Sequence, residues 1–192
     1  MQKALGEQWY QLPPALMAHY DENENGENLA HGLLTIEYPW FMQWPLNFFR
    51  IMGALVNKRG RALKTKVTKI NKDGKQFWHR EVDYPDRKKI IFESVFVSGH
   101  NRDFIEYINA FLGLRTVAFV KDKKLHYESK GYVLKLGKIL IPVSEWLALG
   151  HASIVEWQED CCDNKTFDMD FRIKHPIFGE LFCYKGRFTT QE

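Results

Sequence analysis

The segment TFDMDFRIK, residues 166–174, decides the fold class because its side chains alternate strictly between apolar and polar. Its apolar residues share one face, as in a half-buried β-strand: Phe167, Met169, Phe171 and Ile173. Pro176 and Gly179 then supply turn residues, and residues 180–188 alternate again. The segment therefore predicts a β-hairpin in an antiparallel sheet that is buried on one face.

Working outward, the same alternation predicts strands near 29–38, 63–67, 76–82, 89–98, 115–121, 125–136 and 151–159. Helical patterns occur in two short pieces within residues 1–20 and at 46–56, while 102–112 also fits helical spacing. No linker divides the chain, so we expect a single domain over residues 1–192. The expected fold is β-rich α+β. It has a single antiparallel, strongly curved sheet or barrel of about eight or nine strands and a few helices, one covering an opening.

Composition narrows the possible functions. The net charge of +3 is too small to indicate a nucleic-acid partner. Three cysteines without a Cys-x-x-Cys spacing argue against a disulfide framework and a zinc site, so we expect no metal, no cofactor and a cytoplasmic protein. No apolar region typical of a signal peptide begins the chain, and the apolar stretch from Trp40 to Val56 is too short and broken to span a bilayer.

Trp78 and Arg80 are the first candidate site residues, because residues two apart share one face of a strand. If Trp78 faces the core, Arg80 does too, and a buried guanidinium needs a carboxylate or an anionic ligand. Asp170 is the first expected partner, although alternation places it opposite Phe171, and Glu156 is the second. The alternatives are a structural ion pair and a cation in a pocket.

An apolar pocket inside the sheet is the leading functional hypothesis. The aromatic content is high, at 15%, and small barrels can hold one small ligand. We expect a binding module for an apolar or amphipathic small molecule, such as one with an anionic head. The expected ligand-binding residues are Trp78, Arg80, Phe92, Glu156, Asp170 and Tyr184.

Two other hypotheses remain open. An enzyme could use Arg80, His100 and a carboxylate such as Asp170, with Arg102 nearby, but no recognisable catalytic motif surrounds them. A peripheral membrane or partner-docking protein could use Trp40–Val56 together with the basic run from Lys58 to Lys69. The basic run is otherwise typical of a solvated strand face.

Several spaced motifs resemble the bacterial family called domain of unknown function 4166. They include Leu12-Pro13-Pro14, Trp78-x-Arg80, Phe92-x-Ser94, Asp170-Phe171, Pro176-x-x-Gly179 and Tyr184-x-Gly186. This family occurs alone or fused behind saccharopine-dehydrogenase-like modules. The resemblance implies one β-rich domain and, by association only, a possible oxidoreductase partner. It supplies no catalytic residues, and this chain departs from the family pattern at Met169.

Overall fold

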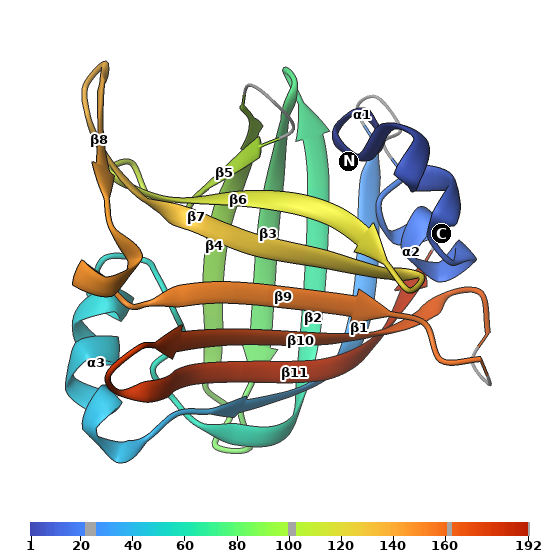
Figure 1. Cartoon of the computed structure of the whole chain (residues 1–192). Coiled ribbons are helices and arrows are strands. Elements are labelled where there is room, and N and C mark those ends of the chain that lie inside the picture. Colours follow the sequence, from blue (N-terminus) through green and yellow to red (C-terminus); the bar gives the residue numbers. More distant parts are fainter. Residues whose placement is uncertain (22–25, 100–102, 161–162, 192) are drawn as a thin grey trace.

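The computed structural model describes residues 1–21, 26–99, 103–160 and 163–191, which form a closed antiparallel β-barrel (Figure 1). The strands are β1 (Glu27–Glu37), β2 (Gly60–Lys72), β3 (Lys75–Asp83), β4 (Lys89–Ser98), β5 (Asp103–Tyr107), β6 (Leu112–Lys121), β7 (Lys124–Leu136), β8 (Ile139–Val143), β9 (His151–Trp157), β10 (Thr166–His175) and β11 (Gly179–Gln191). The helical elements are α1 (Gln2–Leu5), η1 (Gly6–Gln11), α2 (Pro14–His19), η2 (Trp40–Met42), α3 (Gln43–Ile51) and η3 (Glu145–Leu147).

Pairing between β6 and β7 closes the barrel. The strand order is β6-β5-β4-β3-β2-β1-β11-β10-β9-β7, and β8 adds to β7 outside this ring. The predicted barrel is confirmed, although the described residues form ten barrel strands and one extra strand rather than eight or nine. The helical spacing in 102–112 was misleading, because Asp103–Tyr107 pairs with both β4 and β6 as strand β5.

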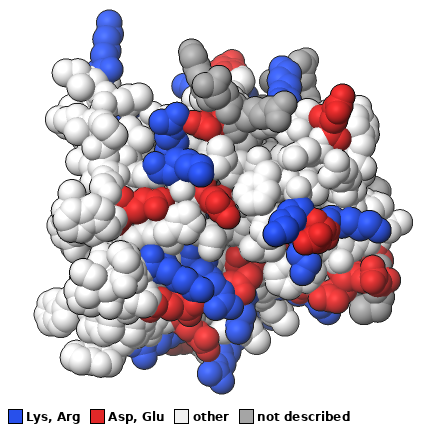
Figure 2. All heavy atoms as spheres, in the orientation of Figure 1, with Lys and Arg blue, Asp and Glu red and all other residues white. Residues whose placement is uncertain are grey.

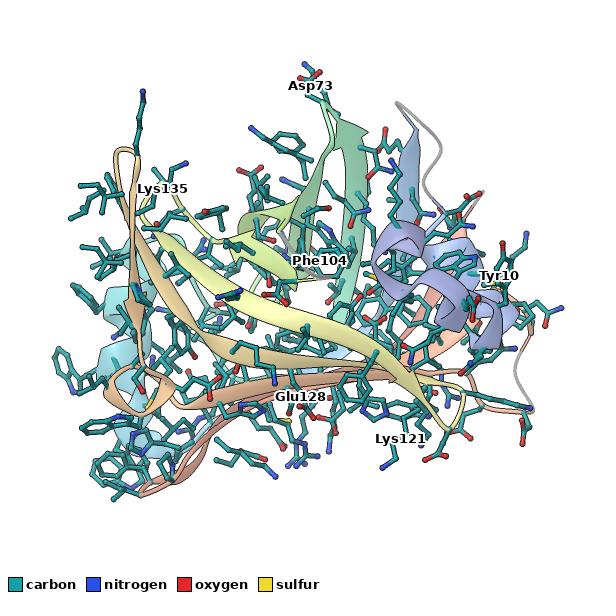
Figure 3. The ribbon with its side chains drawn as sticks, turned by 45° about the horizontal axis from the view of Figure 1, so that its top comes forward. Tyr10, Asp73, Phe104, Lys121, Glu128 and Lys135 are labelled. Atoms are coloured by element: carbon teal, nitrogen blue, oxygen red, sulfur yellow. The ribbon has the colours of Figure 1, made fainter. Side chains whose placement is uncertain are left out.

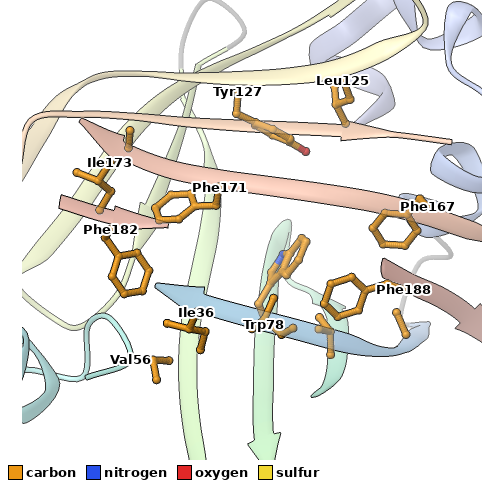
Figure 4. Packing of buried hydrophobic residues seen from close by; sticks show 14 of the residues in the cluster. Ile36, Val56, Trp78, Leu125, Tyr127, Phe167, Phe171, Ile173, Phe182 and Phe188 are labelled. Carbon is orange, nitrogen blue, oxygen red and sulfur yellow. The ribbon is translucent and has the colours of Figure 1, made fainter. Parts of the chain in front are cut away.

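The terminal hairpin forms as the alternation predicts. Phe167 pairs with Phe188 and Phe171 with Tyr184, in antiparallel register. The rings of Phe171 and Tyr184 stack at 4.5 Å between centroids, inside the barrel. These aromatic side chains meet residues of the opposite wall in one continuous core (Figure 4).

Helices lie at both ends of the barrel (Figure 1). At one end, α1 and η1 contact β6, and α2 contacts β10 and β11. At the other end lies α3, which covers an opening as predicted but spans Gln43–Ile51 rather than 46–56. Its Leu46 is fully buried, and Phe49 faces the barrel interior. No helix in the described part of the chain is long and apolar enough to cross a membrane.

Candidate ligand site in the barrel interior

The barrel interior contains two small chambers, of about 40 and 80 Å³. The first lies against the C-terminal end of α2, and the second lies against α3 and the loop that follows it. Arg80, Phe92 and Tyr184 line both chambers and therefore form the partition between them. Ligand pockets usually measure roughly 300–1,000 Å³. A molecule of more than a few atoms therefore fits only if the partition side chains move.

A wider groove of about 880 Å³ lies next to the first chamber, on the outside of the barrel. It runs between the N-terminal helices and the turn that joins β2 to β3, where Tyr10, Asp73 and Phe104 line it (Figure 3). Trp78 and Tyr127 line both this groove and the first chamber. Phe96 also lines both, so three rings stand between the groove and the interior.

Arg80 is the charged residue at the partition. Its guanidinium lies 4.6 Å from the ring centre of Trp78 and 5.0 Å from that of Phe92. One Nη donates to Ser94 Oγ at 2.8 Å, and the other donates to Glu106 Oε1 at 3.2 Å. These bonds run across the inner face of β3, β4 and β5. They leave three of the five N–H groups of Arg80 without a partner among the described residues.

Glu156 is a buried carboxyl group in the wall of the first chamber. Tyr20, at the C-terminal end of α2, donates its hydroxyl to Glu156 at 2.8 Å. Burial raises the pKa of Glu156 to about 7, although the charges of Lys69 and Arg80 and the Tyr20 bond oppose this rise. The carboxyl group therefore changes its charge near neutral pH.

Lys69 is buried beside this pair without lining either chamber. Its ammonium lies 4.0 Å from the ring centre of Tyr20 and 4.3 Å from that of Trp78, and it donates to the carbonyl oxygen of His19 at 2.7 Å. Burial lowers the pKa of Lys69 well below its usual value, while Glu156 raises it. Two aromatic faces and one carbonyl take the place of water around this ammonium.

His19 is the least satisfied polar side chain of the first chamber. It is only 3% exposed, and its Nδ1 has no hydrogen-bond partner in the described structure. Burial, helped by the charges of Lys69 and Arg80, lowers its pKa well below the usual value. The imidazole is therefore neutral near pH 7, with a ring nitrogen free to bond a ligand.

The structure brings five of the six predicted site residues to the chamber walls: Trp78, Arg80, Phe92, Glu156 and Tyr184. Asp170 is the exception, and the expectation that it meets Arg80 is wrong. β10 has no bulge at this position, so Asp170 stays on the outer face opposite Phe171, where it binds Arg172 at 2.7 Å. Asp170 therefore cannot be the carboxylate of the proposed catalytic group inside the barrel, and His100 and Arg102 lie outside the described residues.

Glu106 takes the place that Asp170 and Glu156 were expected to fill, and sequence reasoning missed it because β5 was not recognised as a strand. Lys69 was counted with the solvated basic run, although it shares the inward parity of the buried Val67. Tyr20 and Tyr127 were not recognised as site residues from the sequence, because their roles depend on how α2 and β7 enter the barrel.

The described residues contain no cluster of three or more His, Cys, Asp or Glu side chains that could hold a metal ion. Cys183 is a free, buried thiol on β11, and burial raises its pKa to about 11. Such a thiol is a poor nucleophile. Cys161 and Cys162 lie outside the described residues.

The comparison with protein families extends over almost the whole barrel. A family model described as domain of unknown function (DUF4166) matches residues 12–188 of the 192. The match runs from the residues preceding α2 to β11, and so includes all the residues placed at the chambers above. Comparison with curated proteins gives no match. The chain belongs to the DUF4166 family.

Proposed function

We propose that this barrel binds a small molecule with an apolar body and a carboxylate head in its interior. The observation that carries the proposal is the position of Arg80, between two largely apolar chambers and with three N–H groups that no described residue bonds. A guanidinium binds a carboxylate through paired, charge-assisted hydrogen bonds. The site therefore offers one anchor for a polar head and apolar walls for the remainder.

The walls fit an apolar body. Aromatic side chains from four strands surround the first chamber: Trp78, Phe92, Phe96, Phe167, Tyr184 and Phe188. The second chamber is lined mainly by aliphatic and aromatic residues, including Phe49 and Phe171. Such walls favour a ligand by removing its apolar surface from water. The groove at the N-terminal helices provides a route of entry past Trp78.

The buried polar groups suit a carboxylate head. Glu106 already neutralises one face of Arg80. Glu156, with a pKa of about 7, can be protonated when a second carboxylate enters the chamber. A protonated Glu156 does not repel the ligand. In the same wall, His19 Nδ1 can donate a hydrogen bond to the carboxylate in the neutral tautomer that carries the proton on this atom.

Calorimetric titration with straight-chain carboxylates, from butanoate to dodecanoate, tests the proposal. Each added methylene should tighten binding about fourfold, from roughly 0.8 kcal/mol per buried CH₂. The gain should stop at the length that fills both chambers. Native mass spectrometry of the purified protein should show a co-purified molecule of the same class. Absence of binding along the whole series would contradict the proposal.

Arg80→Met alone would leave Glu106 buried without its cation, so the informative variant is Arg80→Met/Glu106→Gln. This variant should bind the carboxylates about 10- to 100-fold more weakly, from about 1.5–3 kcal/mol for charged hydrogen bonds. It should still bind methyl ketones of equal length, which shows that the chambers are intact. The matched control is Arg172→Met on the outer face, which should leave affinity unchanged. Carboxylate affinity that survives the double substitution would exclude Arg80 as the anchor.

A further inference from the structure

The end of the barrel at α3 exposes an apolar surface, here called the α3 face: Trp40, Phe41, Trp44, Phe48, Ile51 and Phe178. Trp40 is 80% exposed, Trp44 83% and Ile51 85%. The surface is continuous across elements, because the ring of Phe41 lies 6.2 Å from that of Trp40 and 6.5 Å from that of Phe178 in the β10–β11 turn. Figure 2 shows this side of the molecule as largely uncharged.

The α3 face extends to η3. His175, at the end of β10, contacts the ring of Phe178 at 5.0 Å and bonds the carbonyl oxygen of Trp146 at 2.9 Å. Trp146 is 59% exposed, and its neighbour Leu147 is 65% exposed. Scattered apolar side chains are common on protein surfaces, whereas a contiguous aromatic patch indicates a binding surface. The inner side of α3 packs on the core through Leu46 and Phe49, so its outer side is available for another contact.

A basic groove of about 680 Å³ borders the α3 face. Trp40 lines it together with Lys58, Arg59 and Lys88, and its lining includes no Asp or Glu. Arg59 stacks on Tyr38 at 4.6 Å, and neither Arg59 nor Lys88 makes an ion pair within the described structure. Lys58 binds Asp86 at 2.6 Å, which leaves the charges of the other two available.

The sequence around the α3 face and the basic groove also carries positive charge without negative charge. From Tyr38 to Lys72 the chain contains no acidic residue. Tryptophan rings prefer the boundary between lipid headgroups and acyl chains, and cations beside them attract anionic headgroups. A protein partner would instead need a complementary acidic surface around an apolar centre. The combination of protruding Trp rings with a groove sized for headgroups favours lipid.

We propose that the α3 face docks on the surface of an anionic lipid bilayer. Trp40, Trp44 and Ile51 enter the headgroup–acyl boundary, and Arg59 and Lys88 bind lipid phosphates in the basic groove. Docking of this kind is interfacial and requires no membrane-spanning segment. It does not depend on what the barrel interior holds.

Flotation with two kinds of vesicle tests the proposal: phosphatidylcholine alone, and phosphatidylcholine mixed with phosphatidylglycerol. The protein should float with the anionic vesicles and not with the neutral ones. Binding should weaken as salt rises from about 0.1 to 1 M, where the screening length falls from about 10 to 3 Å. Absence of flotation with the anionic vesicles, or equal flotation with both kinds, would overturn the proposal.

Two double variants separate the apolar and the charged contributions. Trp40→Ser/Trp44→Ser should abolish flotation. Arg59→Gln/Lys88→Gln should weaken partition about 30-fold, from roughly fivefold per charge. The matched controls are Tyr10→Ser at the opposite end and Lys64→Gln/Lys66→Gln on the barrel wall, and both should float like the unsubstituted protein.

All these positions are on the surface, so unchanged thermal unfolding should confirm that each variant folds. Flotation that survives both double substitutions at the α3 face would overturn the proposal. Sedimentation without lipid gives the competing outcome. A dimer that Trp40→Ser/Trp44→Ser dissociates, with no flotation, would assign the α3 face to a second copy of the chain.

Discussion

Single residues explain how charged groups are kept inside the barrel. Isolated buried charges are costly, so each must gain a partner or lose its charge. Arg80 gains Glu106 and two aromatic rings, while Lys69 gains a carbonyl and two rings. Glu156 follows the second route, because burial shifts its pKa to about 7. Its protonation state therefore links the interior to the pH of the solution.

Glu156→Gln should remove a component of the pH dependence of stability. The pKa of this carboxyl is about 7 in the folded protein, against an ordinary value of 4.5, so the folded state binds the proton more tightly. Its stabilising contribution is complete at low pH and is lost as the pH rises through about 7. Between about pH 5 and pH 8, the unfolding free energy of the unsubstituted protein should fall by roughly 2 kcal/mol relative to the variant.

Urea denaturation at several pH values measures this difference. Glu128→Gln, on the outer face of β7, is the matched control and should keep the profile of the unsubstituted protein. A constant difference between Glu156→Gln and the unsubstituted protein across this pH range would show that Glu156 is charged throughout, against the assignment above.

At the scale of elements, glycines allow the strands to bend and approach one another. A Cβ atom at Gly186 on β11 would lie 2.4 Å from the carbonyl oxygen of Leu33 on β1. Gly131 adopts a φ of +121° beside an irregular register between β6 and β7, where β7 leaves β9 and pairs with β8. Neither glycine lines a chamber, so both serve the curvature of the barrel.

Gly186→Ala should destabilise the protein by about 3 kcal/mol, because the methyl group meets backbone that cannot move without shifting β1. Gly74→Ala is the control. Its Cβ would meet nothing within 4 Å, but its φ of +70° makes the substitution cost about 1 kcal/mol. Midpoints of urea unfolding compare the two variants. Equal midpoints would mean that β1 and β11 can move apart at Gly186 with little loss of stability.

At the scale of the whole molecule, closure of the barrel gives each of the ten ring strands a neighbour on both sides. β8 lies outside this ring. β10 pairs along its length with β9 and β11, whereas β7 is the single partner of β8 among the described strands. Ile139, Leu140 and Ile141 are each more than 40% exposed on β8. β8 therefore lacks both the second strand and the core packing that hold β10.

Amide hydrogen exchange should separate the two strands. Amides of β8 should exchange through local opening, orders of magnitude faster than those of β10, which should require global unfolding. Mass spectrometry of proteolytic fragments covering 139–143 and 166–175 makes the comparison. Equal protection of both fragments would contradict the assignment of β8 as an appended strand.

The sequence by itself determined which side of each predicted strand faces inward, because alternation is a local property of neighbouring residues. It placed Phe171, Trp78 and Arg80 in the core, predicted the terminal hairpin and gave the barrel class. The alternation also placed Asp170 on the outer face of its strand, opposite Phe171. Lys69 lies two residues after Val67 and therefore shares its buried face. The sequence analysis grouped Lys69 with the neighbouring exposed lysines instead.

Only the tertiary structure decided which inward groups meet. Arg80 binds Glu106 because β3, β4 and β5 are neighbours, and Tyr20 reaches Glu156 because α2 closes that end of the barrel. The same closure raises the pKa of Glu156 and leaves the rings of Trp40 and Trp44 outside the core. Contacts between strands depend on the strand order and on the closure of the barrel. Both bring together residues that are far apart in the chain, so neither can be predicted from a local sequence pattern.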